Sequence, residues 1–162
     1  MPSRMPFMLA LASCLCALAF VLGLQIFEHL DPCPLCVLQR VGLLFASVWF
    51  LVGVLHGSRT FWAKIYGLLA SLGLLFGGLM ALRQIWLQHL PPDQAPACSP
   101  TFFYAFEHLP FPLAWHVMFD GTGSCARITW QWLGLSLAEY SALWFLLMLG
   151  FCFLTILRNP KK

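Results

Sequence analysis

Four long apolar runs constrain this chain more than any other feature of its sequence. They cover residues 7–27, 37–55, 61–82 and 137–157. A helix rises about 1.5 Å per residue, so about 20 residues cross the roughly 30 Å hydrocarbon layer of a bilayer. The chain is 60% hydrophobic and only 9% charged, whereas soluble domains carry roughly 25% charged residues. We therefore predict a single all-α domain over residues 1–162, an integral membrane four-helix bundle.

The first run can also be interpreted as a cleaved signal peptide. The tetrapeptide that ends at Cys14 resembles a lipoprotein processing box, and Arg4 would supply a short basic region before it. The apolar run continues well past Cys14, however, and no hydrophilic mature domain follows it. We therefore expect residues 7–27 to be the first membrane helix.

The basic residues predict the orientation of the bundle. Six of them fall at the amino terminus, in the link between the second and third runs, or at the carboxyl terminus: Arg4, Arg59, Lys64, Arg158, Lys161 and Lys162. These places share one side of a four-helix bundle, and the positive-inside rule makes that side cytoplasmic. Loops 28–36 and 83–136 then face outward. A net charge of +3 with no basic face gives no indication of nucleic-acid binding.

Two features inside these segments bear on packing. Gly73, Gly77 and Gly78 suggest a face where another helix approaches closely, although glycine is frequent in membrane helices in general. The long outer loop is rich in proline, which argues against a continuous helix or a central strand. Its apolar stretch at residues 111–119 is too short to span, and we predict a short helix in the membrane interface. A loop that packs its aromatic side chains on the bundle is the alternative.

The chain has seven cysteines, which divide by position. Three lie inside apolar runs, where we expect them to pack as small hydrophobic side chains: Cys14, Cys16 and Cys152. The other four lie in the outward segments: Cys33, Cys36, Cys98 and Cys125. An even set of cysteines on the outer side is typical of a disulfide system in an oxidising compartment.

Cys33 and Cys36 form a Cys-x-x-Cys pair where the second helix is predicted to begin. Pro34 fits the first helical turn, because its missing N–H costs nothing there. Unpaired backbone N–H groups and the positive end of the helix would then stabilise a thiolate at Cys36. A Cys-x-x-Cys pair can also supply half of a zinc site, but the chain has no second such pair. Val37 stands where a c-type haem motif requires histidine.

Arg40 is four residues after Cys36 and would lie on the same helical face, one turn deeper. A cation at that depth is costly, so we interpret it as functional. It could hold the Cys36 thiolate, or donate a hydrogen bond to a carbonyl oxygen of a quinone dissolved in the membrane. The alternative is an arginine that only reaches the headgroups. We interpret Gln39 as a polar helix-end residue and Arg83 as an interfacial anchor, although either could line the site.

Cys98 and Cys125 are open to two interpretations. A disulfide between them could simply staple the long loop. Alternatively, Cys98 lies in an accessible proline-rich segment that suits exchange with an outside protein, and Arg127 could favour a thiolate at Cys125. The spacing of the two cysteines leaves both interpretations open.

Together these features resemble the bacterial disulfide bond formation protein B family. The resemblance rests on the four apolar runs and on CPLCVLQR at residues 33–40, WLQHLPP at 86–92, GSC at 123–125 and WLGL at 132–135. It implies a quinone-dependent thiol oxidase in the bacterial inner membrane, with both termini cytoplasmic and the cysteine loops periplasmic. The implied electron acceptor is ubiquinone or menaquinone. The implied partner is a periplasmic, thioredoxin-like oxidase of the DsbA type.

The resemblance also implies a role for each cysteine. Cys98 would form a mixed disulfide with the reduced partner, and Cys125 would exchange with Cys33. Cys36 would then be left as the thiolate that faces the quinone, with Arg40 as its polar partner. Electrons would run from the partner through both cysteine pairs to the quinone.

Two other functions are compatible with such a chain. A vitamin K epoxide reductase-like quinone reductase also combines a membrane bundle with Cys-x-x-Cys, but its active cysteines typically lie beside a late helix. A non-catalytic scaffold would use disulfides only to staple its outer loops. Arg40 distinguishes the scaffold from an enzyme, because a staple does not require a cation one turn below a cysteine.

Overall fold

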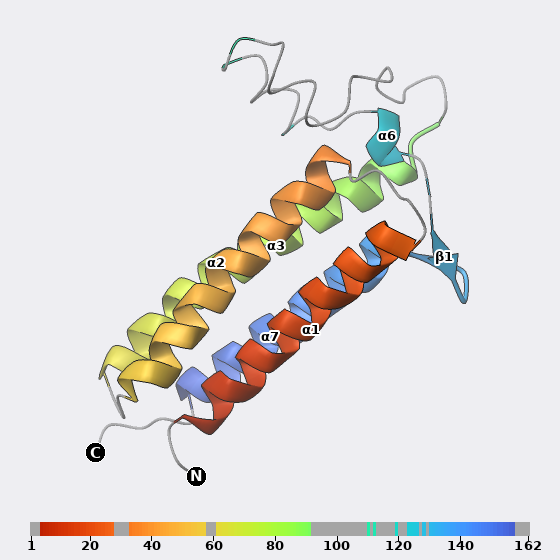
Figure 1. Cartoon of the computed structure of the whole chain (residues 1–162). Coiled ribbons are helices and arrows are strands. Elements are labelled where there is room, and N and C mark those ends of the chain that lie inside the picture. The colour runs from red at the N-terminus through yellow and green to blue at the C-terminus, as the bar shows by residue number, and fades with distance from the viewer. Residues whose placement is uncertain are drawn as a thin grey trace.

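The bundle consists of four long helices in a computed structural model that describes residues 4–27, 33–57, 61–91, 110, 112, 119, 123–126, 128 and 130–157. The helices are α1 (Met5–Phe27), α2 (Pro34–His56), α3 (Phe61–Gln88) and α7 (Leu137–Leu157) (Figure 1). Each is long and apolar enough to cross a membrane. The predicted all-α membrane bundle is therefore confirmed. The short helix predicted at residues 111–119 lies outside the described residues, apart from its positions 112 and 119.

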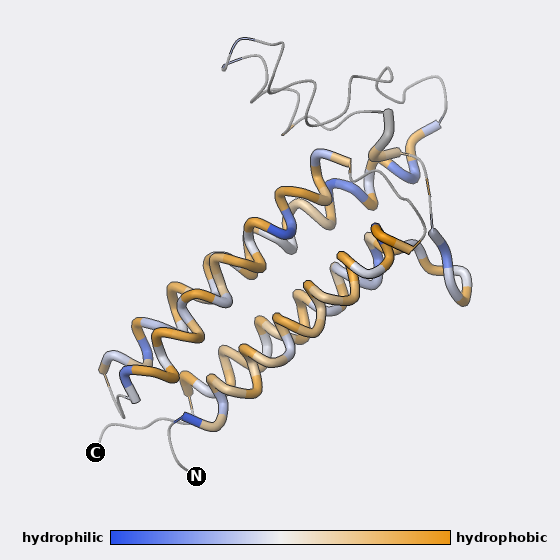
Figure 2. Tube along the Cα trace, in the orientation of Figure 1, coloured by the Kyte–Doolittle hydropathy of each residue, from blue (hydrophilic) through white to orange (hydrophobic). Residues whose placement is uncertain are grey.

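Three helix–helix interfaces hold the bundle together. α1 packs on α2, α2 on α3, and α3 on α7. Among the described residues, the backbones of α1 and α7 come close at few points, although side chains of both helices, including Cys14 and Cys152, belong to one core cluster. Figure 2 shows that all four helices are hydrophobic along most of their length. Large apolar side chains such as Phe20 and Leu147 are exposed on the outside, as expected for helices solvated by lipid.

The closest approach within the bundle joins α2 and α3 at Gly42 and Gly73. A methyl group on either glycine would lie 2.7 Å from the carbonyl oxygen of the other. One turn along α3, Gly77 leaves room for the ring of Phe145 on α7. The prediction that Gly73 and Gly77 lie on a face of close helix approach is therefore confirmed. This face sets the positions of α2 and α7 relative to α3.

Replacing Gly73 with leucine is expected to destabilise the bundle. The added side chain would collide with the α2 backbone at Gly42 and Ala46, and overpacking of this kind costs about 1–3 kcal/mol. The matched control is Gly150→Leu on α7, because nothing lies within 4 Å of the position that its Cβ would take. Thermal unfolding in detergent should show a lower midpoint only for Gly73→Leu. Equal midpoints would show that the close approach is not needed.

The two ends of the bundle differ in character. α2 ends at Gly57, which adopts the left-handed conformation (φ 61°) and donates its N–H to Gly53 O at 3.2 Å. Arg4 lies against Gly57, where a cation suits the negative end of a helix. At the other end, called the cysteine end from here on, α2 begins and α3 ends (Figure 1).

The third helix is longer than the sequence predicted. α3 continues to Gln88 instead of stopping at residue 82, so Arg83 and Gln84 belong to a helix and not to the outer loop. The polar side chains at 83, 84 and 88 end the hydrophobic run in sequence, yet they do not end the helix. The residues after α3 include α6 (Gly123–Ala126), a single helical turn that packs on α3 and α2.

A small hairpin, which the sequence did not predict, precedes α7. Strands β1 (Gln131–Trp132) and β2 (Leu135–Ser136) pair antiparallel. Leu133 (φ 49°) and Gly134 (φ 84°) form the turn between them, with positive φ at both central positions as in a type I′ turn. Tyr140 Oη donates to the carbonyl oxygen of Trp132 at 3.0 Å, which fixes the hairpin to α7.

The start of α7 is fixed by a capping box at Ser136 and Glu139. Ser136 N–H donates to Glu139 Oε2 at 2.6 Å, and Glu139 N–H donates back to Ser136 Oγ at 3.4 Å. Ser136 Oγ also donates to Gln88 Oε1 at 2.9 Å. The end of α3 and the start of α7 are therefore joined at the cysteine end of the bundle.

Candidate active site

Three sulfur atoms come together at the cysteine end of the bundle. Sγ of Cys33 and Sγ of Cys36 lie 2.8 Å apart, and Cys125 on α6 forms a hydrogen bond with Cys33. Cys125 is fully buried and Cys33 nearly so, beside three leucines: Leu35, Leu38 and Leu87. The structure thus brings together three of the four cysteines predicted to be active. The fourth, Cys98, lies outside the described residues, as does Arg127.

The N-terminus of α2 positions the Cys-x-x-Cys pair. Cys33 is the N-cap in extended conformation (φ −69°, ψ 157°), and Pro34 begins the first turn as predicted. The backbone N–H of Cys36 donates to Cys33 Sγ at 3.3 Å. The cap therefore brings Cys36 Sγ next to Cys33 Sγ, within reach of a disulfide bond. Cys33 therefore contacts both Cys36 and Cys125.

The neighbours of Cys33 keep its thiol protonated. The hydrogen bond with Cys125 is the main cause that raises the pKa of Cys33 above its usual range, and the contact with Cys36 and burial raise it further. An ordinary cysteine titrates near pH 8.5, so its thiolate fraction grows roughly 20-fold between pH 7 and pH 9. Cys33 should remain a thiol across that window.

Alkylation of the reduced protein tests this expectation. The rate at Cys33, followed by mass spectrometry of the modified peptide, should stay slow and nearly constant between pH 7 and pH 9. Removing the main cause with Cys125→Ala should restore part of the increase with pH. A steep increase at Cys33 in the unaltered protein would contradict the raised pKa.

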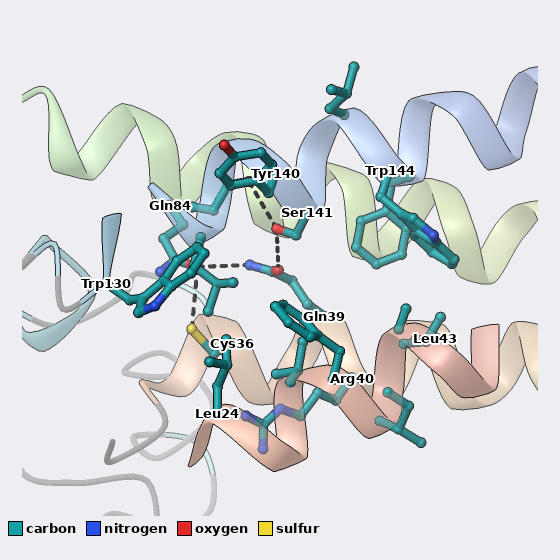
Figure 3. A pocket seen from close by; sticks show the side chains of 18 of the residues that line it. Leu24, Cys36, Gln39, Arg40, Leu43, Gln84, Trp130, Tyr140, Ser141 and Trp144 are labelled. Atoms are coloured by element: carbon teal, nitrogen blue, oxygen red, sulfur yellow. Dashed lines mark hydrogen bonds between the residues drawn. The ribbon is translucent and has the colours of Figure 1, made fainter. Parts of the chain in front are cut away.

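The Cys36 sulfur contacts a chain of amide side chains that crosses the bundle (Figure 3). Cys36 Sγ lies 3.5 Å from Gln84 Oε1, which also accepts from Gln39 Nε2 at 2.8 Å. Gln39 Oε1 in turn accepts from Ser141 Oγ on α7 at 2.9 Å. Sequence reasoning missed Gln84 because it assigned residue 84 to a loop, and it missed Ser141 because nothing in the predicted helix 137–157 indicated which face meets Gln39. It treated Gln39 as a polar helix end, whereas Gln39 is only 9% exposed.

Arg40 lies one turn deeper than Cys36 and lines the same cavity. Its Nη1 donates to Gln25 Oε1 on α1 at 2.5 Å. Its Nε is buried and has no hydrogen-bond partner among the described residues. Among these residues Gln84, and not Arg40, forms the hydrogen bond with the Cys36 sulfur. A buried donor without an acceptor is costly, so a ligand that brought an acceptor atom to this edge of the guanidinium would stabilise it.

A cavity of about 580 Å³ lies between α1 and α7, and residues of α2 form a further wall. Its walls are mostly apolar, and its polar residues include Cys36, Gln39, Arg40 and Gln84. Phe20 on α1 and Leu147 on α7 line the cavity and are also exposed on the outer surface. The cavity therefore opens between α1 and α7, onto the face of the bundle that lipid would cover.

The cysteines inside the apolar runs behave differently from one another. Cys14 and Cys152 are buried in the core, as predicted. Cys16 is exposed and lines the cavity, so it does not pack in the core as Cys14 and Cys152 do. The reason is that α1 and α7 do not close on each other here. Arg83 is not part of the cavity lining that the structure describes.

The lining suits a flat apolar ligand that carries carbonyl oxygens. Cavities for small ligands typically enclose about 300–1,000 Å³, with apolar walls and a few placed polar groups. Arg40 Nε has no acceptor in the part of the chain that the structure describes, and Cys36 lines the same cavity. Both features fit a quinone head group, with an apolar tail leaving through the side opening.

Comparison with known proteins agrees with this geometry. The family described as Disulfide bond formation protein DsbB matches residues 3–155. Disulfide bond formation protein B of Acinetobacter baylyi is 41% identical over 94% of this chain and 89% of its own length. That of Marinobacter nauticus is 40% identical over 98% of this chain and 95% of its own. Disulfide bond formation protein B 1 of Pseudomonas aeruginosa is 37% identical over 96% of both chains.

No solved structure matches the chain. The family match covers nearly all of the sequence, including the four membrane helices, the Cys-x-x-Cys pair and Cys125. The chain therefore belongs to the disulfide bond formation protein DsbB family.

Proposed function

We propose that this membrane oxidoreductase oxidises the dithiol of a periplasmic, thioredoxin-like partner of the DsbA type and passes both electrons to membrane quinone. One observation carries the proposal. Cys33 and Cys36 both line a cavity that opens toward lipid, and Cys33 also contacts Cys125. A single cysteine pair is therefore placed between a protein disulfide and a membrane-soluble acceptor.

The protein side of the reaction is thiol–disulfide exchange. One thiolate of the partner's dithiol attacks Cys98 of the Cys98–Cys125 disulfide, which forms a mixed disulfide and releases the Cys125 thiolate. The partner's second thiol then breaks the mixed disulfide, which leaves the partner oxidised and releases Cys98 as a thiolate. Cys125 then attacks Cys33, so the Cys33–Cys36 bond breaks, a Cys33–Cys125 bond forms and Cys36 leaves as a thiolate. Attack of Cys98 on Cys125 restores the first disulfide and releases Cys33. The contact between Cys125 and Cys33 supports this order.

The quinone side of the reaction uses the cavity. Arg40 Nε would donate to a quinone carbonyl oxygen, and Gln25 would hold the guanidinium from α1. A bound quinone supplies an acceptor of two electrons and two protons. Cys36 and Cys33 give up the two electrons and return to a disulfide. Ubiquinone and menaquinone share the two carbonyl oxygens that this site would recognise.

The charge distribution supports an orientation in the bacterial inner membrane. Arg4 and Lys64 lie at the end of the bundle opposite the cysteines. By the positive-inside rule that end is cytoplasmic, so both termini face the cytoplasm and the cysteine loops face the periplasm. Structural disulfides and thiol oxidation both belong on that outer side.

Neither alternative function accounts for the site equally well. A stapled scaffold requires no free sulfur cluster, yet Cys33, Cys36 and Cys125 share one buried site beside an apolar cavity. A vitamin K epoxide reductase-like enzyme typically has its active cysteines beside a late helix, and here they begin α2. Family membership also favours the thiol oxidase.

Anaerobic mixing of the purified protein with a reduced thioredoxin-like partner and a short-chain ubiquinone tests the proposal. Quinone absorbance should fall in step with formation of the partner's disulfide, one quinone per disulfide. Absence of electron transfer from a folded protein would favour the scaffold. Reduction of a quinone epoxide in place of the quinone would favour the vitamin K epoxide reductase-like function.

A further inference from the structure

The amide chain behind Cys36 has a geometry that the exchange reaction described above does not use. It consists of Gln84 on α3, Gln39 on α2 and Ser141 on α7, joined by hydrogen bonds of 2.8 and 2.9 Å (Figure 3). Gln84 is only 6% exposed. Buried polar groups must be paired, because each unpaired group costs about 1–3 kcal/mol. The chain must therefore remain satisfied whenever Cys36 changes its protonation state.

Each hydrogen bond of the amide chain has a defined donor and a defined acceptor. The Cys36 thiol donates to Gln84 Oε1, Gln39 Nε2 donates to the same oxygen, and Ser141 Oγ donates to Gln39 Oε1. This arrangement suits a thiol. It does not suit a thiolate, because a negative sulfur beside a carbonyl oxygen has lost its hydrogen bond and is repelled.

Ser141 allows every donor and acceptor in the amide chain to exchange roles. Its hydroxyl lies 2.9 Å from Gln39 Oε1 and also 2.9 Å from the backbone carbonyl oxygen of Ala138, while a hydroxyl has only one proton to donate. Suppose that the proton points to Ala138. Ser141 can then accept from Gln39, and a turned Gln39 presents its oxygen to Gln84. A turned Gln84 in turn presents two N–H groups, one to Gln39 and one to the Cys36 sulfur.

We propose that Gln84 is a further catalytic residue of the thiol–quinone reaction, accepting from the Cys36 thiol and donating to the Cys36 thiolate after its amide turns over. Gln39 and Ser141 are positioning residues that turn with it. The inference rests on the proposed role of Cys36 as the cysteine that delivers electrons to quinone. In both arrangements each side chain of the amide chain keeps a hydrogen bond. No backbone movement is required, because a glutamine amide exchanges O and N by rotation about its last side-chain bond.

The hydrogen bond between Gln84 and Cys36 differs in strength between the thiolate and the thiol, which makes the proposal testable. An N–H bond to a thiolate is charge-assisted, whereas a thiol is a weak donor. Removing the Gln84 amide should therefore cost the thiolate more than the thiol. The groups that also act on the Cys36 sulfur are Cys33, Cys125 and Arg40, and they must be kept unchanged in every variant.

The experiment measures alkylation of Cys36 in the reduced, full-length protein against pH, with mass spectrometry to resolve the site. Gln84→Leu should move the midpoint of the Cys36 profile upward by about one pH unit or more. Gln84→Glu keeps the size and polarity of the side chain, so it serves if the leucine variant does not fold. In its ionised form this carboxylate cannot donate to a thiolate, and it should shift the midpoint in the same direction. An unchanged or lowered midpoint in a folded variant would overturn the proposal.

The chain offers a matched control and a rescue. Gln88 lies one turn further along α3 and bonds Ser136 instead of a cysteine, so Gln88→Leu should leave the midpoint where it is. Ser141→Ala should raise it by less than Gln84→Leu, and Ser141→Thr, which keeps the hydroxyl, should restore it. If the Cys36 midpoint in Ser141→Thr were as high as in Ser141→Ala, the hydroxyl would not be the group that lets the amide chain exchange donors and acceptors.

Failure of this inference can be separated from failure of the proposed function. Quinone reduction by a small dithiol is measured in parallel for Gln84→Leu and for Cys36→Ser. Loss of activity only in Cys36→Ser, with an unchanged midpoint in Gln84→Leu, would reject the turning amide and leave the function intact. Retained activity in Cys36→Ser would reject the function itself.

Discussion

Replacing Cys36 with serine is expected to abolish quinone reduction. Serine cannot form a disulfide with Cys33, so no pair remains beside the cavity to release two electrons. The Cys36 sulfur lies on the cavity wall and 2.8 Å from Cys33 Sγ, and no other described pair of sulfurs is placed in this way. With a small dithiol as donor and a short-chain ubiquinone as acceptor, turnover should fall to the uncatalysed background.

Cys98→Ala is the informative companion to this variant. It should block oxidation of the thioredoxin-like partner, because the predicted entry point is lost. It should nevertheless leave quinone reduction by a small dithiol intact, because Cys33, Cys36 and the cavity are unchanged. If quinone reduction disappeared in folded Cys98→Ala as well, the two-pair relay would be wrong. If Cys36→Ser kept its activity, the electrons would have to reach the quinone by another route.

Replacing Arg40 with methionine is expected to raise the apparent KM for quinone by about 10- to 100-fold. A hydrogen bond to a charged group contributes about 1.5–3 kcal/mol, which corresponds to a change of this size. The buried Nε of Arg40 has no partner among the described residues, so the structure leaves it free to donate to a ligand. Initial rates over a series of quinone concentrations measure the change.

Two variants control for loss of charge and for loss of shape. Arg40→Lys keeps the charge but not the planar fork of donors, and its KM should fall between those of the unaltered protein and Arg40→Met. Arg83→Met removes a second arginine at the same end of the bundle, outside the described cavity lining, and should leave the KM unchanged. Unchanged quinone kinetics in folded Arg40→Met would remove Arg40 from the site.

The open side of the bundle accounts for how an apolar acceptor could reach a cysteine. The backbones of α1 and α7 come close at few points, and the cavity between them is lined by side chains that are also exposed, such as Phe20 and Leu147. In a soluble protein such a gap would expose apolar surface to water. In a bilayer it joins the cavity to the solvent in which quinones dissolve.

Local features of the site could be predicted because they depend on neighbours in sequence. Pro34 in the first turn of α2 follows from its fixed backbone angle and missing N–H. The position of Arg40 one turn below Cys36 follows from helical spacing. Features that depend on polarity alone were less reliable. Arg83 and Gln84 end the apolar run but not the helix, because a helix near the membrane surface can continue with polar side chains, of which Gln84 is paired inside the bundle.

The hairpin before α7 is a second feature that could not be predicted from local sequence. Leu133 occupies a position with positive φ, where leucine is rare, so its residue type gives little indication of a type I′ turn. The turn is held from outside itself, by the bond from Tyr140 to Trp132 and by the capping box that begins α7. Contacts between residues eight positions apart, as between Trp132 and Tyr140, are not visible in a window of local propensity.

The sequence by itself determined the membrane bundle of four spanning helices, the Cys-x-x-Cys pair at a helix start and the arginine one turn below it. Length, hydropathy and helical spacing are local properties, so they can be read from the chain without knowing how it packs. Only the tertiary structure decided that Cys125 lies against Cys33, that Gln84 lies against Cys36, and that α1 and α7 leave a cavity open. Cys36 and Gln84 are 48 residues apart, and their contact depends on how closely α2 and α3 cross. The backbones of Gly42 and Gly73, where any side chain would collide, set that distance.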